Sequence, residues 1–273
     1  MSDSHFHHLS SISYIDLIGS GTSQFLKGQL TINADLLDAK TAKLAAFCNH
    51  KGRIVSLFHI LVIDNGFRLL MPKSIVETSI AHIKKYAVFF KLEVIHDQKQ
   101  CIFVSLDCNE SRGDAVNINA TDLSVQFDKI NNSQKQQKSN ETLWYWHMAE
   151  KSIPWLTGET VEHFLPHNLN LPALAAVDFN KGCFTGQEVI ARMQYKGKLK
   201  QHLKQLKTSE IRTIMALCRL FQMDKNVAEV ICAVSHQELG SLVLAIVKDS
   251  ADKDKFFQLK LENTSILELK INE

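Results

Sequence analysis

The sequence predicts an α+β fold, with a body of mixed sheets and helices followed by a small C-terminal antiparallel β domain. Residues 43–72 hold apolar runs around two glycine-containing turns, which predicts a strand meander. Residues 73–90 place apolar side chains close to helical spacing. Beyond about residue 200, polar and apolar residues alternate around short turns, a pattern typical of a small barrel or sandwich. We therefore expect two domains, 1–198 and 199–273.

Shorter patterns fill in the rest of the body. Residues 11–18 predict a first strand, and residues 19–37 predict a loop that leads into a short helix. Two further strands are expected between residues 91 and 107. After a polar stretch, Trp144 and Trp146 would face opposite sides if their segment is a strand.

Composition limits the classes of protein to which the chain can belong. Its 273 residues carry a formal net charge of +2, so nucleic-acid binding would need a local basic patch. Six cysteines form no CxxC pair, which excludes zinc-ribbon spacing and favours reduced thiols. The histidines of HFHH near the start are expected to be incidental, and we predict no metal site. Without a secretory leader, and with apolar runs below the roughly 20 residues that span a bilayer, we expect a cytoplasmic protein with no membrane partner.

The stretch NKGCFTGQEVIARMQYKGKLK, residues 180–200, contains one cysteine just ahead of a predicted helix. Thr185 and Glu188 fit a capping box, in which the two side chains satisfy backbone N–H groups of the first turn. Cys183 would then lie near the positive end of the helix dipole, and Lys181 lies two residues before it. Both effects favour a lowered thiol pKa. An inert, buried cysteine is the plainer alternative.

The residues around this cysteine carry two further signals. Gly182 and Gly186 remove side chains on either side, so a ligand or partner could approach the backbone closely. The spacing matches neither a phosphate-binding loop nor a dinucleotide fingerprint. Residues 191–207 then hold six basic residues, no acidic residue and Tyr195. Such a strip could bind a polyanion, such as RNA or the carboxylates of an acidic cofactor, or it could be a solvated linker.

Five segments, in order along the chain, resemble one known family. KGCFTGQE resembles the K-G-C-[FY]-x-G-Q-E signature of the YgfZ family of folate-binding proteins. That family is related to the T-protein (aminomethyltransferase) of glycine cleavage and to mitochondrial iron–sulfur assembly proteins. The resembling segments are spread over most of the length of residues 12–200. Apart from the signature they are residues 25–37, 44–54, 84–94 and 164–197, and the signature lies inside the last of these.

The resemblance implies a T-protein-like body with a site for tetrahydrofolate, or a derivative of it, in its central cleft. It also implies a functional thiol at Cys183. At a second position, where family members have a tryptophan on the first strand, this sequence has Ile12. The residues that the resemblance places around the folate are Trp144, Lys181, Gly182, Gln187, Glu188 and Arg192, with Arg192 near the glutamate carboxylates.

The expected function is that of a folate-binding accessory protein, non-catalytic or weakly catalytic. It would support the assembly or repair of iron–sulfur enzymes, such as those that thiolate tRNA, and thereby tRNA modification. Direct contact with tRNA is less expected than this indirect effect. One alternative is a tetrahydrofolate-dependent aminomethyl or one-carbon transferase, although the G-Y-T-G-E-x-G motif of the T-protein is not found. Another alternative is an RNA-binding module that uses the strip 191–207.

Overall fold

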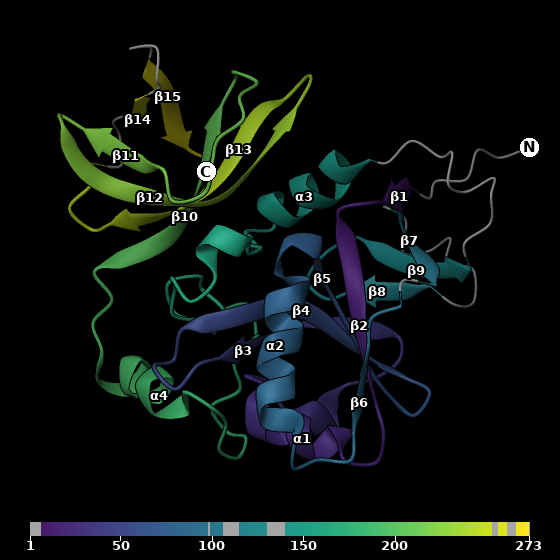
Figure 1. Ribbon diagram of the computed structural model, residues 1–273. Coiled ribbons are helices and arrows are strands. Elements are labelled where there is room, and N and C mark those ends of the chain that lie inside the picture. Colours follow the sequence, from purple (N-terminus) through teal and green to yellow (C-terminus); the bar gives the residue numbers. More distant parts are fainter. Residues whose placement is uncertain are drawn as a thin grey trace, which may run out of the picture.

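The computed structural model describes residues 7–97, 99–105, 115–129, 140–252, 256–260 and 266–272. Within them, nine strands form one curled sheet in the order β1-β7-β9-β8-β3-β4-β5-β2-β6 (Figure 1). The expected α+β fold is therefore confirmed. These strands are β1 (His7–Leu9), β2 (Ile12–Ile18), β3 (Thr41–Cys48), β4 (Ile54–Ile63), β5 (Gly66–Pro72), β6 (Glu93–Ile95), β7 (Gln100–Ser105), β8 (Val116–Ile118) and β9 (Ser124–Lys129).

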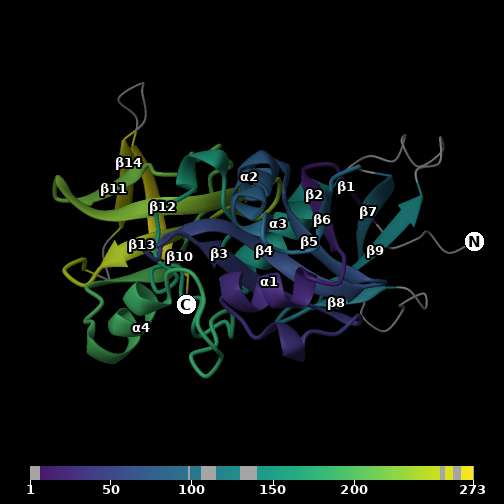
Figure 2. The same cartoon turned by 60° about the horizontal axis from the view of Figure 1, so that its bottom comes forward.

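Six further described strands close into a barrel in the order β10-β13-β12-β11-β14-β15. They are β10 (Gln201–Thr208), β11 (Arg219–Gln222), β12 (Lys225–His236), β13 (Gly240–Lys248), β14 (Phe257–Lys260) and β15 (Ile266–Ile271). The α-helices are α1 (Thr22–Gln29), α2 (Val76–Ala87), α3 (Glu141–Glu150) and α4 (Gln187–Lys196), and short 3-10 turns are η1 (Ala34–Leu36), η2 (Lys73–Ile75) and η4 (Gly158–Thr160). In Figure 2 the barrel and α4 lie at one end of an elongated molecule and β7 and β9 at the other.

β4 runs through the centre of the body and is buried along most of its length. It pairs antiparallel with β3 on one side and β5 on the other, so the predicted meander is confirmed. Ser56 Oγ lies 2.7 Å from Ser79 Oγ of α2, and the ring of His59 lies edge-on to Trp144 of α3. Residues 56 and 59 point to opposite faces of a strand. Helices therefore cover both faces of β4, which explains why its side chains are apolar on both faces apart from Ser56 and His59.

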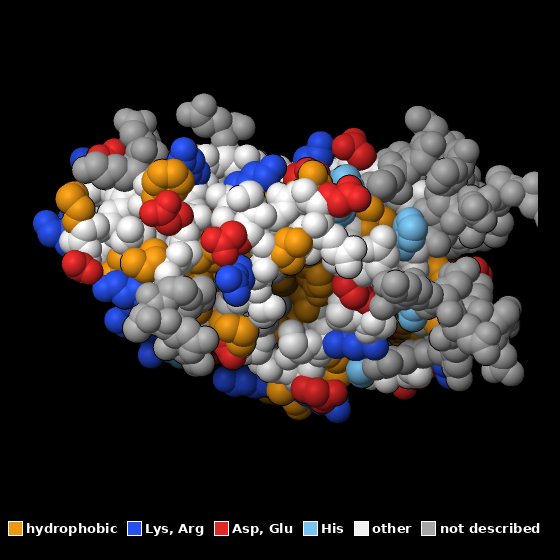
Figure 3. Space-filling model, turned by 90° about the horizontal axis from the view of Figure 1, so that it is seen from above, with side chains coloured by type: hydrophobic (Ala, Val, Ile, Leu, Met, Phe, Trp, Pro, Cys, Tyr) orange, Lys and Arg blue, Asp and Glu red, His pale blue; other side chains and the backbone are white. Residues whose placement is uncertain are grey.

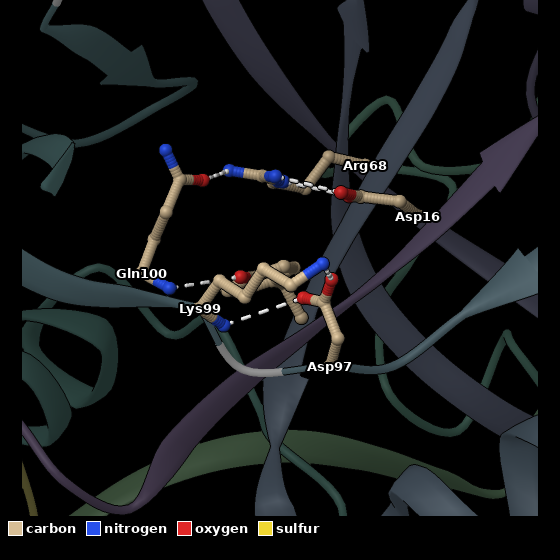
Figure 4. Close-up of polar contacts among 6 residues, drawn as sticks. Asp16, Arg68, Asp97, Lys99 and Gln100 are labelled. Carbon is tan, nitrogen blue, oxygen red and sulfur yellow. Dashed lines mark hydrogen bonds and ion pairs between the residues drawn. The ribbon is translucent and has the colours of Figure 1, made fainter. Parts of the chain in front are cut away.

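Arg68 joins the two halves of the large sheet. Its guanidinium donates two hydrogen bonds to Asp16 of β2, each 2.7 Å long, and a third to Gln100 Oε1 of β7 at 2.6 Å (Figure 4). The same guanidinium carbon lies 4.0 Å from the centre of the Tyr14 ring and 4.6 Å from that of Phe127. A planar cation can stack on aromatic rings while it binds a carboxylate in its own plane. One side chain thus connects β2, β5, β7 and β9.

The barrel packs against the body through α3. Leu242 of β13 is buried against Trp146 and Ala149 of α3, and Ile231 and Leu244 belong to the same apolar cluster as the core of the body. The alternating strands expected beyond residue 200 are present, and one of their short turns joins β12, which ends at His236, to β13, which begins at Gly240. The barrel starts at Gln201, and the domain boundary between residues 198 and 199 stays a prediction.

The segment of Trp144 and Trp146 is a helix and not a strand. Asn140 caps it, since its side-chain oxygen accepts from the Leu143 N–H at 3.2 Å. Alternating tryptophans do not distinguish a strand from a helix that is buried on several sides, and both side chains are buried here. None of the helices in the described part of the chain has the length and apolar character needed to cross a lipid bilayer.

Candidate functional site

The signature KGCFTGQE forms a turn that leads into α4. The helix begins at Gln187, and its N-cap is Gly186, which has φ +84° and no side-chain cap. The predicted capping box of Thr185 and Glu188 is therefore wrong. The Thr185 N–H instead donates to the carbonyl of Gly28 at 3.1 Å, in the last turn of α1. This attachment to α1 holds Thr185 outside the helix, so a glycine takes the cap position.

Gly186 is also the point where the signature meets the β3–β4 turn, residues 49–53 (Figure 1). A Cβ at position 186 would lie 2.5 Å from the Asn49 carbonyl oxygen and 2.9 Å from Gly52 Cα. Gly52 has φ +73°, and a Cβ there would lie 3.1 Å from Cβ of Val189 in α4. Both positions therefore need glycine. The space at Gly186, expected to admit a ligand, is occupied by the protein's own turn.

Cys183 lies on the exposed surface just before this helix. Gly182 is exposed as well, and a Cβ added there would meet no atom within 4 Å. Cys48 and Cys232 differ, because both are buried and burial raises the pKa of each thiol. Among the cysteines that the structure describes, Cys183 is the exposed one, so the alternative of a buried cysteine is wrong and a partner can reach its sulfur.

Lys181 binds the end of α1. Its Nζ donates to the carbonyls of Lys27 at 3.0 Å and Leu30 at 2.5 Å. The same nitrogen lies 4.8 Å from the centre of the Phe184 ring. Burial lowers the pKa of Lys181 to about 8, and the charge of Asp178 acts in the opposite direction. A cation at the C-terminal end of a helix satisfies carbonyls that have no partner within it, so Lys181 fastens the signature to α1.

Trp144 lies elsewhere, in an apolar cavity beneath α3. Ile12 lines the same cavity, so the two positions that the resemblance links to folate do lie together. His59 also lines it, 5.9 Å from Trp144 between ring centres, and its Nε2 has no hydrogen-bond partner among the described residues. Burial lowers the pKa of His59 to about 4, so its ring is neutral at pH 7. The remaining wall is formed by Leu44, Leu57, Phe58, Leu70, Met71, Pro72, Met148, Pro154 and Trp155.

The side chains of this cavity suit a pterin ring, but the cavity is too small to hold one. Trp144 and Trp155 offer aromatic faces, and His59 Nε2 offers one unused hydrogen-bonding nitrogen. The cavity volume is about 20 Å³, whereas pockets for organic ligands measure roughly 300–1,000 Å³. A pterin would therefore enter only if α3 or the segment with Pro154 and Trp155 moved away from the sheet.

The structure places the predicted site residues in two groups. Gly186 touches the turn at the start of β4, whereas Trp144 touches His59 in the second half of that strand. His59 lies seven positions after Gly52, which itself stands two residues before β4 begins, and seven positions of extended chain span about 20 Å. Gln187 is half-buried at the start of α4, and Glu188 and Arg192 are exposed further along it. The thiol and the aromatic cavity are therefore separate places on this molecule.

Comparison with known proteins identifies relatives of the chain. No family model matches it. The tRNA-modifying protein YgfZ of Vibrio atlanticus is 29% identical to it over 244 residues, which cover 81% of this chain and 75% of that protein. The protein of the same name from Aliivibrio fischeri is 26% identical over 283 residues, covering 92% and 87%. That of Escherichia coli O157:H7 is 24% identical over 287 residues, covering 89% and 85%.

The chain is similar to proteins of the YgfZ family over most of its length, as the sequence motifs led us to expect. Its fold is also that of the glycine cleavage system aminomethyltransferase T from Bartonella henselae, with a TM-score of 0.68. The superposition covers 98% of this chain and 84% of that one at 14% sequence identity, so the likeness is one of fold. The T-protein-like architecture expected from the sequence is thereby confirmed.

Two larger cavities of this chain lie where the body meets the barrel. One, of about 300 Å³, contains Arg53 and Lys248, together with His163 Nε2, which lies 2.6 Å from Glu229 Oε1. The other, of about 800 Å³, is a cleft between α3 and the β12–β13 hairpin, with Trp146 in its wall. Figure 3 views the face on which α3 and this hairpin lie, and a hollow with hydrophobic side chains at its floor lies in the middle of that face.

Sequence reasoning did not find His59 or these cavities. An apolar strand gives no sign that one buried imidazole lacks a partner, because core histidines look the same in sequence. Arg53 lies in the β3–β4 turn, and its partner comes from a residue far along the chain. Its guanidinium donates to the carbonyl oxygen of His163, a contact between the β3–β4 turn and the segment that precedes the signature.

Proposed function

We propose that this chain is a folate-binding accessory protein that supports iron–sulfur enzymes and, through them, the modification of tRNA. The proposal is supported by relatives that are named tRNA-modifying proteins and by a fold shared with an aminomethyltransferase. The observation that carries it is the exposed thiol of Cys183, held on a turn that three contacts fix in place. These contacts are Gly186 against Asn49, Lys181 on α1 and Thr185 on Gly28.

The exposed thiol would act on partners and not within a pocket of this chain. Candidate partners are iron–sulfur enzymes such as those that thiolate tRNA. An exposed sulfur on a fixed turn can meet a cluster or a reactive group of such an enzyme without a large rearrangement of its own backbone. Gly182 leaves open space beside the sulfur, which a partner surface could fill.

Complementation tests this role of the thiol. Cys183→Ser should fold like the parent but fail to restore tRNA thiolation in a strain that lacks the protein. The matched control is Cys101→Ser, because Cys101 is half-buried on β7, and β9 and β8 separate β7 from β3, the strand that leads into the turn against the signature. Full restoration of tRNA thiolation by Cys183→Ser would remove the thiol from the function.

Folate would be held by the cavity beneath α3, with Trp144 against the pterin and Arg192 further away than expected. Tetrahydrofolate should quench tryptophan fluorescence, and Trp144→Phe should abolish most of that quenching. Because the cavity must open, we expect slow, saturable binding whose rate levels off at high tetrahydrofolate concentration. Trp146→Phe is the control, since Trp146 lines the α3–hairpin cleft instead. If tetrahydrofolate left the tryptophan fluorescence unchanged, folate binding would be excluded from the proposed function.

A second candidate is one-carbon transfer from an aminomethyl donor to tetrahydrofolate. The likeness of the fold to aminomethyltransferase T favours it. General acid–base chemistry would need a titratable group beside the pterin, and His59 is the titratable side chain in the described wall of the cavity. Turnover of an aminomethyl donor above background, and its loss in His59→Gln, would establish this activity.

A further inference from the structure

One end of the molecule presents a basic surface built from two distant segments. We define it by Lys51 in the β3–β4 turn and by Arg192, Tyr195, Lys196 and Lys198 on and after α4. All five side chains are exposed. The close approach of Gly52 to Val189 and of Gly186 to Asn49 joins the turn to the helix. In Figures 1 and 2, α4 projects at the edge of the molecule beneath the barrel.

The cations of this surface have no carboxylate partners of their own. No ion pair among the described residues involves Lys51, Arg192, Lys196 or Lys198, although ion pairs occur elsewhere, such as Lys27 with Asp35. Glu188 in the first turn of α4 is the one acidic side chain of that helix. Unpaired cations side by side repel one another, and a polyanion would relieve that repulsion.

Tyr195 adds an aromatic face to this charge. Its side chain is 71% exposed, which is unusual for a tyrosine. It is held in position because its ring lies against the edge of Phe179, at 6.1 Å between ring centres. The helix beneath it is fixed by the contact of Gln194 with His167 at 3.2 Å. A fixed, exposed ring between cations can stack with an unpaired base.

We propose that the basic α4 surface binds RNA directly, with phosphates on its lysines and an unpaired base on Tyr195. An acidic protein would satisfy the lysines equally well, but it would not need the exposed ring between them. RNA binding at this surface needs neither folate nor the Cys183 thiol. It therefore goes beyond the proposed function, and the two proposals can be tested independently. The basic surface differs from the strip 191–207 expected from the sequence. Lys204 and Lys207 of that strip belong to barrel strand β10 and are not part of the surface, whereas Lys51 from the β3–β4 turn is part of it.

Binding of labelled, unfractionated bacterial tRNA, followed by fluorescence anisotropy, tests the proposal. The parent should bind with a Kd on the order of 10⁻⁶–10⁻⁴ M and weaken steeply between about 50 and 200 mM salt. Lys196→Glu with Lys198→Glu should weaken binding about tenfold or more and flatten the salt dependence. The control is Lys84→Glu with Lys85→Glu on α2, which changes the net charge equally at exposed positions. It should change the Kd less than about twofold.

Tyr195 separates RNA from other polyanions. Tyr195→Ala should weaken tRNA binding by about fivefold or more, Tyr195→Phe should restore it, and neither should alter binding of a fully paired RNA duplex. Absence of tRNA binding at low salt would overturn the proposal, as would equal effects of the two double charge reversals. Displacement of tRNA by polyglutamate as readily as by unlabelled tRNA would also overturn it, since the surface would then suit an acidic protein. Unchanged tetrahydrofolate binding in the α4 variants separates this result from the folate role.

Discussion

At the scale of single residues, Gly182 and Gly186 flank the same cysteine but have opposite surroundings. Gly186→Ala would force a Cβ to within 2.5 Å of the Asn49 oxygen at φ +84°. We expect it to lower the free energy of unfolding by about 2–4 kcal/mol. Gly182→Ala places its Cβ in open space and should change stability by less than about 0.5 kcal/mol. Urea unfolding of both variants measures the difference, and equal losses would contradict the packing at Gly186.

His59 makes a residue-scale contribution to the pH dependence of stability. Burial lowers its pKa from the ordinary value of 6.5 to about 4. Below pH 6.5 the unfolded chain therefore takes up a proton that the folded chain refuses, so the free energy of unfolding falls as the pH is lowered toward 4. Above pH 6.5 this effect disappears. His82 adds a similar contribution, because burial also lowers its pKa to about 4.

The variant His59→Gln should flatten this dependence. One histidine accounts for at most about 1.4 kcal/mol per pH unit between pH 6.5 and 4. Urea unfolding at several pH values in that window measures the slope, with His50→Gln as a control at an exposed position. A parent and a His59→Gln variant with the same slope would show that the ring is not buried as described.

At the scale of elements, Lys181 connects the signature turn to α1. Lys181→Met keeps much of the side-chain volume but leaves the carbonyls of Lys27 and Leu30 without this donor. We expect a loss of about 1–3 kcal/mol and faster amide exchange in the last turn of α1. Lys181→Arg should recover part of the loss. Unchanged exchange in α1 would mean that the turn is held by its other contacts alone.

The elements themselves were predictable from the sequence wherever periodicity is clear. The meander of residues 43–72 and the alternating strands of the barrel follow from local patterns that burial enforces. The cap of α4 was not predictable in the same way. Thr185 and Glu188 satisfy the local rule, but contacts of the turn with Gly28 and Asn49 decide where the helix begins. Those contacts join residues more than 100 positions apart.

The candidate site shows the same limit. The resemblance led to Cys183, which is exposed, and to Trp144 and Ile12, which share a cavity. It gave no sign that the cysteine and the tryptophan lie at different places along β4. It also gave no sign that Lys51 joins the basic surface, because that depends on the packing of two glycine turns.

At the scale of the whole molecule, the body and the barrel are joined by a shared core. Trp146 and Ala149 of α3 are buried against Leu242, and Leu244 and Cys232 belong to the apolar cluster of the body. Separating the two parts would expose these surfaces to water, at a cost of about 25 cal/mol for each Å². The barrel is therefore expected to unfold together with the body, although each part has a β-sheet of its own.

This shared core predicts a single cooperative unfolding transition. The three tryptophans lie at positions 144, 146 and 155, so their fluorescence reports on the body. Cys232 is buried on barrel strand β12 where it packs on the body, so in a variant with serine at the other cysteines its reaction with a thiol reagent reports when this barrel strand becomes exposed. In urea the two signals should have the same midpoint, and Leu244→Ala should lower both midpoints together, with a loss of about 2–5 kcal/mol. Two separate midpoints, or a shift of the thiol signal alone, would show that the barrel unfolds independently and that α3 only rests on its surface.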